Sequence, residues 1–414
     1  MKADAAAVIA LALALSGCRS ATDAQPASEG RQPYRGWVTT RAGDDIPFFF
    51  ELPANCNVER AAILNGPERL SLPCQRLGAR VLLDFVVYGT RISADIDNGG
   101  ALSGHWGHTG GHFGSDDRVR FSAQPLAHLD PALRFAPRDG NRQAYGQGGD
   151  VSGTWRLDFA SRESAKAVLQ IEGNGIVRGT AEVPFEYGDL RYLAGNVHGS
   201  SLSLSTFDGS SAYLIHGRLD GNGRMTGELI RADGSRDAFT AFRSADFDVV
   251  DPLQRVRVTS VEKRLDLAPL LSPRYAGKAV IVELFGTWCS NCNDLAPLLA
   301  ELYKAHREAG LEVLSFAFEL SADEGFVRER VAEYKAAHGV EWDVITPAAT
   351  LQELLTVGPA QLSSISGVPV TLFFNRDRTV RAIYTGFSGP ATGASHQRAA
   401  ATFRRLTKEI LASR

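Results

Sequence analysis

One stretch limits what this chain can fold into, because it joins an apolar run to two cysteines and a helical pattern. The run Val280–Phe285 is rich in Val, Ile, Leu and Phe, which is typical of a buried parallel strand. The residues after it predict a helix that starts near Cys289. A thiol at a helix N-terminus faces unpaired backbone N–H groups and the positive end of the helix dipole, which lower its pKa. Cys289 is therefore the predicted nucleophile.

The second cysteine completes a redox motif. Cys292 lies one helical turn after Cys289 and on the same face, from which it can attack a mixed disulfide formed at Cys289. A Cys-x-x-Cys motif beside a strand–helix–strand pattern is a signature of thiol–disulfide exchange. The sequence therefore predicts redox chemistry at these two sulfurs, and no cofactor is expected.

This motif and its surroundings resemble the thioredoxin superfamily, in particular its TlpA/ResA-like thiol-disulfide oxidoreductases. The matching features are Gly277–Cys292, which ends in Trp-Cys-Ser-Asn-Cys, Pro297 within the helix, and Gly367–Pro369 downstream. The resemblance covers roughly residues 256–414. It implies an α/β thioredoxin-like domain, which we place at residues 251–414, with a central insertion.

The resemblance also implies roles for single residues. Pro369 is expected to follow a cis peptide bond and to pack against the cysteine pair, and the backbone of Val368 is expected to pair with a bound substrate segment. Trp288 is expected to shield the cysteines and to offer an apolar docking surface. The alternative for Pro369 is an ordinary trans proline at the start of a strand.

Glu283, six residues before Cys289, stands where thioredoxins carry a buried acid that relays the proton of the second cysteine. Burial raises the pKa of a carboxyl group, which suits proton transfer near neutral pH. TlpA-like members often lack this acid, so Glu283 is closer to the broader superfamily. The alternative is a polar residue at a strand edge.

The rest of the C-terminal region alternates between helical and strand patterns. The predicted helices are Cys289–Ala309, Asp323–His338, Thr350–Leu355 and Gln397–Ala412, and the predicted strands are Arg255–Val261, Leu311–Phe318, Trp342–Ile345, Val370–Phe374 and Thr379–Tyr384.

The N-terminal residues 1–18 predict a signal peptide. Their apolar segment Ala5–Leu15 is too short to span a bilayer, and the ending Leu15–Cys18 resembles a bacterial lipobox. This resemblance implies a lipid on Cys18 and anchorage on the periplasmic side of a bacterial membrane. The alternative is a buried or disordered apolar N-terminus with an incidental cysteine. Residues 19–33, rich in Ala, Ser, Gln and Pro, predict a flexible tether.

The cysteine count agrees with export. Five cysteines are present, and assigning Cys18 to a lipid leaves Cys56 and Cys74 beside the redox pair. In an oxidising compartment Cys56 and Cys74 are predicted to form a structural disulfide. The alternative is two separate buried thiols.

Residues 34–250 predict an all-β region, an antiparallel barrel or sandwich. Alternating runs such as Pro47–Leu52 and Arg80–Tyr88 are separated by Asn-Gly and Asp-Gly turns. A weak sequence repeat between Tyr88–Gly104 and Asp208–Gly227 indicates two duplicated β-domains or two halves of one barrel, divided as 34–124 and 150–246. Shared hairpin chemistry alone is the alternative.

Two further segments in this region attract attention. Asp189–Gly195 with Leu204–Gly209 resembles the β-rich extension of some TlpA-like lipoproteins and implies a docking or spacer role. The three histidines of His105–His112 could in principle bind zinc or copper. Three glycines and the lack of a neighbouring cysteine or clear carboxylate partner favour a solvated hairpin loop instead, so no metal site is expected.

At 414 residues the chain exceeds one ordinary domain, and 44% hydrophobic residues suffice for full cores. A net charge of −3 without a Lys/Arg block argues against a nucleic-acid partner. We expect exported proteins with disulfides or thiols as partners, and an upstream membrane electron donor.

Three functions compete. The favoured one is reduction of protein disulfides. A thiol peroxidase is disfavoured because Thr287 lies two residues before Cys289 and not three. The third is a non-catalytic binding module on a thioredoxin-like scaffold, which an inert, buried Cys289 would indicate.

Overall fold

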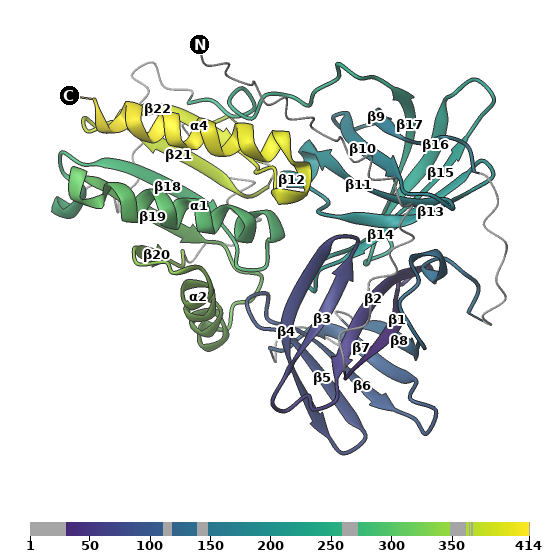
Figure 1. Ribbon diagram of the computed structural model, residues 1–414. Helices are drawn as coiled ribbons and strands as arrows, with labels where there is room; N and C mark the ends of the chain where they lie inside the picture. The colour runs from purple at the N-terminus through teal and green to yellow at the C-terminus, as the bar shows by residue number, and fades with distance from the viewer. Residues whose placement is uncertain are drawn as a thin grey trace, which may run out of the picture.

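Three β-structures make up the molecule (Figure 1). The computed structural model describes residues 30–110, 118–138, 148–258, 272–347, 362–363, 365 and 367–413. Two of the three structures are antiparallel barrels and the third is a mixed sheet covered by helices. The predicted lipidation site Cys18 and the predicted helix Thr350–Leu355 lie outside the described residues.

The first barrel has eight antiparallel strands in chain order, and it closes where Tyr34 of β1 pairs with Pro125 of β8. Alternate side chains point inward, and Phe48, Phe50 and Phe121 fill much of the interior. Its strands are β1 (Arg31–Thr39), β2 (Asp45–Pro53), β3 (Arg60–Asn65), β4 (Glu68–Leu77), β5 (Arg80–Phe85), β6 (Thr90–Ile96), β7 (Leu102–His108) and β8 (Val119–Pro125).

The predicted tether is too long at its C-terminal end. Strand β1 begins at Arg31, and residues 31–33 pair with the end of β2. Gln32 also donates a hydrogen bond to the carbonyl of Leu126. Composition alone predicts a flexible segment there, whereas pairing with a distant strand holds these residues extended.

The second barrel also closes, because β10 pairs with both β9 and β11. Its strand order is β10-β9-β17-β16-β15-β14-β13-β11, with the short β12 attached to β11. The strands are β9 (Gly153–Phe159), β10 (Ala165–Ile171), β11 (Ile176–Val183), β12 (Gly188–Asp189), β13 (Leu193–His198), β14 (Ser201–Phe207), β15 (Ala212–Leu219), β16 (Met225–Arg231) and β17 (Arg236–Arg243). Each half of the β-rich region therefore forms its own barrel, and the weak sequence repeat falls on one hairpin of each.

The two barrels share apolar and polar contacts. Phe207, at the end of β14, belongs to the core of the first barrel, where its ring centroid lies 4.3 Å from that of Phe48. Its carbonyl accepts a hydrogen bond of 2.8 Å from Asn65. The buried Arg134, in the connection between the barrels, donates to the hydroxyl of Ser205 at 2.9 Å. This connection is therefore part of the interface between the barrels.

The third structure is a five-stranded sheet in the order β20-β19-β18-β21-β22. Strand β18 is central, parallel to β19 and antiparallel to β21, and all seven of its residues are buried. Helices α1 and α4 contact each other on one face (Figure 1), and α2 and β20 lie between β19 and β21 in the chain. The elements are β18 (Ala279–Phe285), α1 (Ser290–His306), β19 (Leu311–Ala317), α2 (Glu324–His338), β20 (Asp343–Ile345), β21 (Val370–Phe374), β22 (Val380–Thr385) and α4 (Ala394–Leu411).

The edge strand predicted at Arg255–Val261 does not form within its described part. Only Val258 makes a β-bridge, to Leu362. The predicted helix Cys289–Ala309 divides into α1 and a short 3₁₀ turn, Arg307–Ala309. Among the described residues, no helix is long and apolar enough to cross a membrane.

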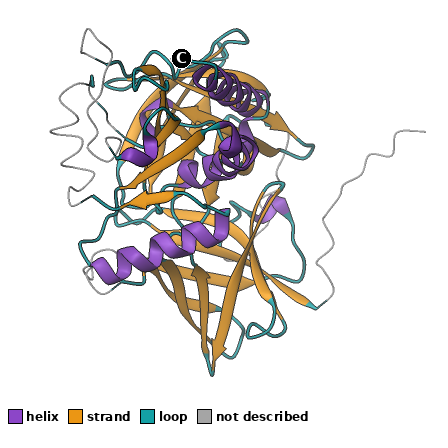
Figure 2. Ribbon diagram, turned by 90° about the vertical axis from the view of Figure 1, so that its left-hand side faces the viewer, coloured by secondary structure: helices purple, strands orange, loops and turns teal. Residues whose placement is uncertain are grey.

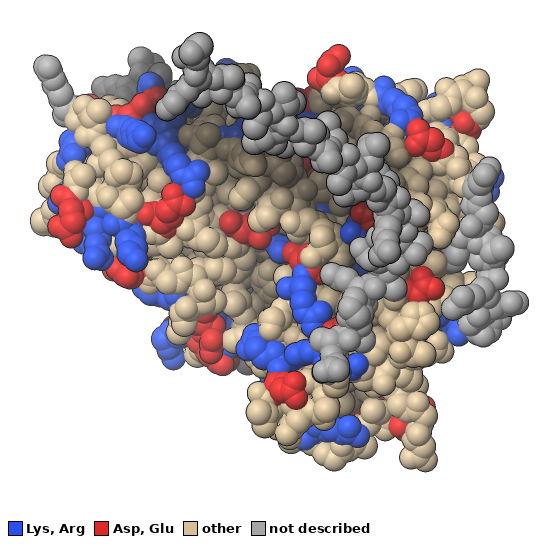
Figure 3. All heavy atoms as spheres, viewed as in Figure 1, with Lys and Arg blue, Asp and Glu red and all other residues tan. Residues whose placement is uncertain are grey.

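The mixed sheet also contacts the first barrel through α2, which lies between them in Figure 2. The guanidinium of Arg330 on α2 donates to the carbonyl of Val86 in the first barrel. On the face shown in Figure 3, basic and acidic side chains are interspersed, as the small net charge leads one to expect. All three β-structures are therefore in contact with one another.

The structure places Cys56 and Cys74 in a disulfide that links the segment after β2 to β4. The sulfurs are joined across 18 residues, and both side chains are buried. We predict that the Cys56→Ala/Cys74→Ala double variant loses about 3 kcal/mol of unfolding free energy, because a link across such a loop restricts the unfolded chain. Urea denaturation without reductant measures the loss.

The single variant Cys56→Ala is the control for this prediction. It removes the same link, so its midpoint should match that of the double variant. A double variant that unfolds at the wild-type urea concentration would contradict the prediction.

Candidate active site

The redox motif lies where β18 ends and α1 begins. Cys289 is the N-cap of α1, and its sulfur accepts a hydrogen bond of 3.1 Å from the backbone N–H of Cys292. The sulfur therefore takes the place of the oxygen that usually satisfies an orphan N–H group at a helix start. A negative charge on this sulfur is stabilised by the same donor and by the helix dipole.

Cys289 and Cys292 form a disulfide, with their Cα atoms 5.2 Å apart. The two sulfurs differ in exposure, since Cys292 is fully buried and Cys289 is 7% exposed. Cys289 lines a pocket and Cys292 does not. Only Cys289 is therefore placed to meet a molecule from outside.

The predicted proline loop is beside the disulfide. The Val368–Pro369 peptide bond is cis, and the sulfur of Cys289 lies 3.7 Å from the carbonyl oxygen of Val368. The carbonyl of Pro369 accepts a hydrogen bond of 2.7 Å from the N–H of Gly386. The loop is thus held between the disulfide and the end of β22.

Trp288 is half-buried, and its indole N–H donates to the carbonyl of Phe318 at 2.8 Å. Its ring lies over Gly286, where a Cβ atom would be only 2.3 Å from the indole nitrogen. Thr287 donates from both its N–H and its hydroxyl to the carboxylate of Glu319. These bonds hold the turn before Cys289 in place.

Glu283 lies in the centre of β18, where it is fully buried. One carboxyl oxygen accepts a hydrogen bond of 2.7 Å from the hydroxyl of Ser315, and the other is without a hydrogen-bond partner in the described structure. Burial raises the pKa of Glu283 to about 7, and the bond from Ser315 opposes this only in part. Glu283 is therefore a buried residue of the central strand, not a residue of a strand edge.

The second barrel also contacts the redox motif, which the sequence did not predict. The hydroxyl of Ser210 donates to the carbonyl of Trp288. The hydroxyl of Ser290, between the two cysteines, donates to Asp208 at 2.5 Å. The N–H of Asp189 donates to the side chain of Asn291 at 3.4 Å. Three residues of the motif, Trp288, Ser290 and Asn291, are thus bound by the barrel.

The segment before β12 packs against the proline loop. Tyr187 has a φ of 57°, and its carbonyl accepts a hydrogen bond of 3.1 Å from Phe387. Its ring covers Gly367, where a Cβ atom would be 2.7 Å from the ring. Gly188 has similarly little room, since a Cβ there would be 2.2 Å from Asn291. Both glycines permit this close approach.

A buried ionic cluster joins all three β-structures next to the motif. The guanidinium of Arg191 contacts Glu68 of the first barrel at 2.5 Å, Asp294 of α1 at 2.8 Å and Asp208 at 3.9 Å. Burial and repulsion from Asp294 raise the pKa of Asp189 to about 7. The single guanidinium of Arg191 therefore forms ion pairs with three carboxylates in this region.

Several of the contacts from the barrel come from the two segments singled out by resemblance, Asp189–Gly195 and Leu204–Gly209, whereas those of Ser210 and Tyr187 come from outside them. These segments supply Asp189, Arg191 and Asp208. The docking or spacer role inferred for them did not include contact with the cysteines. Their only sequence signal was the resemblance, because no pattern in one barrel indicates which distant helix it meets.

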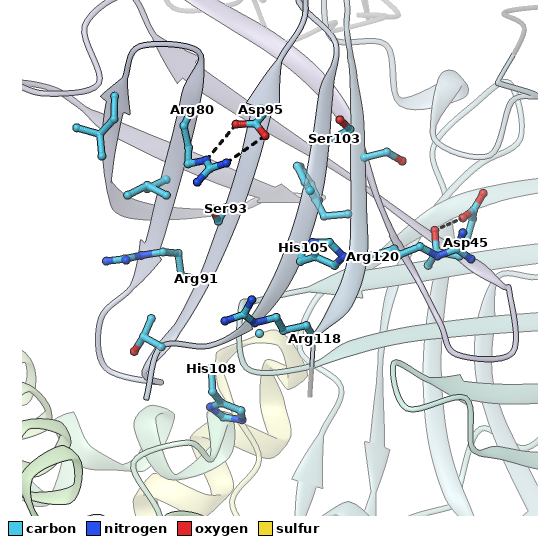
Figure 4. Close-up of a pocket in the computed structure, with 18 of the residues that line it drawn as sticks. Asp45, Arg80, Arg91, Ser93, Asp95, Ser103, His105, His108, Arg118 and Arg120 are labelled. Carbon is cyan, nitrogen blue, oxygen red and sulfur yellow. Dashed lines mark hydrogen bonds and ion pairs between the residues drawn. The ribbon is translucent and has the colours of Figure 1, made fainter. Parts of the chain in front are cut away.

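Two of the three histidines of the predicted hairpin loop lie on a strand and not in a loop. His105 and His108 lie on strand β7, and His112 is outside the described residues. Both line a trough of about 1250 Å³ on the first barrel, which arginines such as Arg120 also line (Figure 4). The described residues contain no group of three or more His, Cys, Asp or Glu that could hold a metal ion. Strand pairing with β6 and β8 places these histidines in the sheet.

The buried carboxyl of Glu283 predicts a pH dependence of stability. Its pKa is about 7 in the folded protein against 4.5 for an ordinary glutamate, so the folded state binds the proton more tightly. Its contribution to stability is complete below about pH 4.5 and is lost as the pH rises through 7. Relative to wild type, Glu283→Gln should gain about 3 kcal/mol of unfolding free energy between these pH values.

Urea denaturation of both proteins at the two ends of this range measures the difference. Glu308→Gln is the control, since the side chain of Glu308 is 94% exposed. Parallel pH profiles for wild type and Glu283→Gln would show that the carboxyl does not titrate in this range.

Sequence comparison gives relatives that match a part of the chain. No family model matches the chain. The curated thiol-disulfide oxidoreductase ResA of Oceanobacillus iheyensis is 23% identical over 140 residues, which are 34% of this chain and 66% of the relative. ResA of Bacillus subtilis is 26% identical over 124 residues, which are 30% of this chain and 59% of the relative. The chain thus spans less than two thirds of the length of these relatives.

Among solved structures, a thioredoxin-family thiol:disulfide interchange protein from Chlorobium tepidum is similar, with 23% identity and a TM-score of 0.26, over 33% of this chain and 83% of the other. The curated relatives are named thiol-disulfide oxidoreductases. This chain has a disulfide between Cys289 and Cys292 at the start of α1, and a cis Val368–Pro369 bond beside it. In sequence, this chain is therefore similar to the ResA thiol-disulfide oxidoreductases.

Proposed function

We propose that this protein is a thiol-disulfide oxidoreductase that works in the direction of disulfide reduction. The observation that supports it most is the placement of Cys289, which caps α1, is joined to Cys292 and lies 3.7 Å from the carbonyl oxygen before the cis proline. The curated relatives are named thiol-disulfide oxidoreductases, which agrees with the proposal.

The exposures of the two sulfurs assign their roles. In the reduced protein the Cys289 thiolate attacks one sulfur of a substrate disulfide, and the first product thiolate leaves. The thiolate of the buried Cys292 then attacks the sulfur of Cys289, which releases the second product and forms the disulfide seen here. The protein loses two electrons in this cycle, and an external thiol donor must restore the reduced form.

Glu283 is the proposed proton acceptor for Cys292. A carboxyl with a pKa of about 7 changes its protonation near neutral pH, as an acid–base group needs. The oxygen that has no hydrogen-bond partner leaves one site free to take up the proton. Substrate contacts are assigned to Trp288 and Val368, which line the pocket at Cys289, with Pro369 shaping the loop.

A non-catalytic module remains the second candidate, because one observation favours it. Cys289 is 7% exposed, which is low for a thiol that must meet a substrate. Against it, a pocket of about 210 Å³ reaches the side of Cys289. Turnover of a small disulfide therefore decides between the two candidates.

We also propose that the protein is exported and held at the periplasmic side of a bacterial membrane by a lipid on Cys18. The lipobox-like ending and the bridge between Cys56 and Cys74 support this location, because structural disulfides persist in oxidising compartments.

For the catalytic proposal, we predict that Cys289→Ser abolishes the reduction of hydroxyethyl disulfide, since Cys289 is the only sulfur-bearing residue that lines the pocket in the described part of the chain. Cys292→Ser should form a mixed disulfide with the substrate and stop there, because the resolving sulfur is missing. Dithiothreitol-driven turnover and mass spectrometry of the intact protein give both results. Full activity of Cys292→Ser would refute the two-cysteine mechanism, and an inert wild type would favour the binding module.

For the anchor, we predict that radiolabelled palmitate is incorporated into the full chain expressed in a bacterial host. Cys18→Ala should carry no label, whereas Cys56→Ala should be labelled like wild type. Equal label in wild type and Cys18→Ala would contradict the anchor.

A further inference from the structure

The sulfur of Cys289 faces a pocket whose walls come mostly from the second barrel. Tyr187, Asp208 and Tyr213 of the barrel lie opposite Trp288 and Val368 of the thioredoxin-like domain. The pocket is the space through which a substrate must reach the sulfur, because Cys292 and the proline loop cover the other sides.

The barrel is bound on both sides of this pocket. On one side, Ser210 and Asp208 hold the carbonyl of Trp288 and the hydroxyl of Ser290. On the other, Tyr187 covers Gly367 and accepts the N–H of Phe387. A folded protein therefore cannot bring its surface onto Cys289 while these contacts persist, because the barrel already occupies that surface.

The volume limits what can enter. At about 210 Å³ the pocket holds roughly seven water molecules, at about 30 Å³ each, and is smaller than a drug-sized ligand site of about 300 Å³ or more. A disulfide on the order of ten non-hydrogen atoms fits this space.

The charges around the pocket are predominantly negative. Asp189 and Asp208 line it, and the single guanidinium of Arg191 is also bound by Glu68 and Asp294. Glu186, a further carboxylate of the wall, is paired with Arg231 outside the pocket lining. Glu68, Asp208 and Asp294 thus share one guanidinium, which favours a cation over an anion at the sulfur.

We propose that the substrate of the closed protein is a low-molecular-weight disulfide that is neutral or cationic, and not a disulfide of a folded protein. The inference rests on the proposed function. For the closed protein, it replaces the protein substrates expected from the sequence with small disulfides. In each cycle the Cys289–Cys292 dithiol gives two electrons and two protons to the small disulfide, its S–S bond breaks, and two small thiols leave. A thiol or dithiol donor returns the electrons.

The first experiment compares a small disulfide and a protein disulfide as substrates of the full-length, reduced wild-type protein. Rate constants for hydroxyethyl disulfide and for insulin are each divided by the rate constant of the same disulfide with free dithiothreitol, which removes differences in intrinsic reactivity. We expect the normalised value for insulin to be lower by about tenfold or more, as for a steric exclusion. Equal normalised values would overturn the size limit.

The second experiment compares small disulfides of nearly the same size that differ in charge. Cystamine, hydroxyethyl disulfide and dithiodiglycolate carry two positive charges, none and two negative charges, and are normalised in the same way. We expect the normalised rates to fall in that order, with about tenfold between the extremes at low salt and less at high salt. No order, or the reverse order, would overturn the charge preference.

Asp208→Asn tests the source of this preference, with Asp220→Asn as the matched control. Both aspartates accept backbone N–H groups in turns of the second barrel, but Asp220 is exposed and does not line the pocket. The ratio of the normalised rates for cystamine and dithiodiglycolate should fall from about tenfold to about threefold in Asp208→Asn, and should not change in Asp220→Asn. Equal ratios in both variants would show that Asp208 does not set the preference.

Tyr187→Ala tests whether the ring of Tyr187 limits access of a protein substrate to Cys289. Tyr192→Ala is the matched control, since the ring of Tyr192 does not line the pocket. Removal of the Tyr187 ring should raise the normalised rate with insulin, whereas Tyr192→Ala should not. An unchanged insulin rate in folded Tyr187→Ala would contradict the cover. If no disulfide of any size oxidises the reduced wild type, the proposed function fails; if insulin reacts as fast as the small disulfide, only the substrate inference fails.

Discussion

The position of one sulfur atom is the constraint on which the active site depends. The sulfur of Cys289 caps α1 and accepts the N–H of Cys292, so a charge on it is stabilised by the helix itself. This position requires that β18 end and α1 begin within a few residues, with a turn tight enough to need Gly286 beneath the ring of Trp288. The buried strand, the turn and the helix therefore form one unit that holds a reactive thiol.

The second barrel adds an outer layer of constraints to this unit. Three residues of the redox motif are hydrogen-bonded to Ser210, Asp208 and Asp189, so the conformation of the motif is coupled to that of the barrel. The ionic cluster around Arg191 ties the same place to the first barrel. Removal of one partner from a buried ion pair typically costs about 3–5 kcal/mol, so this cluster holds the three β-structures in a defined arrangement.

Much of the fold could be predicted from local patterns. The strand Val280–Phe285, the helix near Cys289 and the helix that ends before Gly339 form within a few residues of the predicted bounds, because each depends on its own periodicity and caps. The predictions at residues 31–33 and 255–258 were wrong for one shared reason. Whether a short polar segment forms a strand depends on its partner, and the partner is distant in sequence.

The sequence by itself determined where redox chemistry is expected. Two cysteines at a helix start and a Val-Pro pair further on can be recognised from local spacing, and the effect of the helix on the first sulfur is local as well. It also determined that the N-terminal half is antiparallel β-structure. Only the tertiary structure decided that this half forms two closed barrels and that the second covers the cysteines. The physical reason is that contacts such as Ser290 with Asp208 join residues 82 positions apart, and no periodicity in either segment encodes which surface the other will meet.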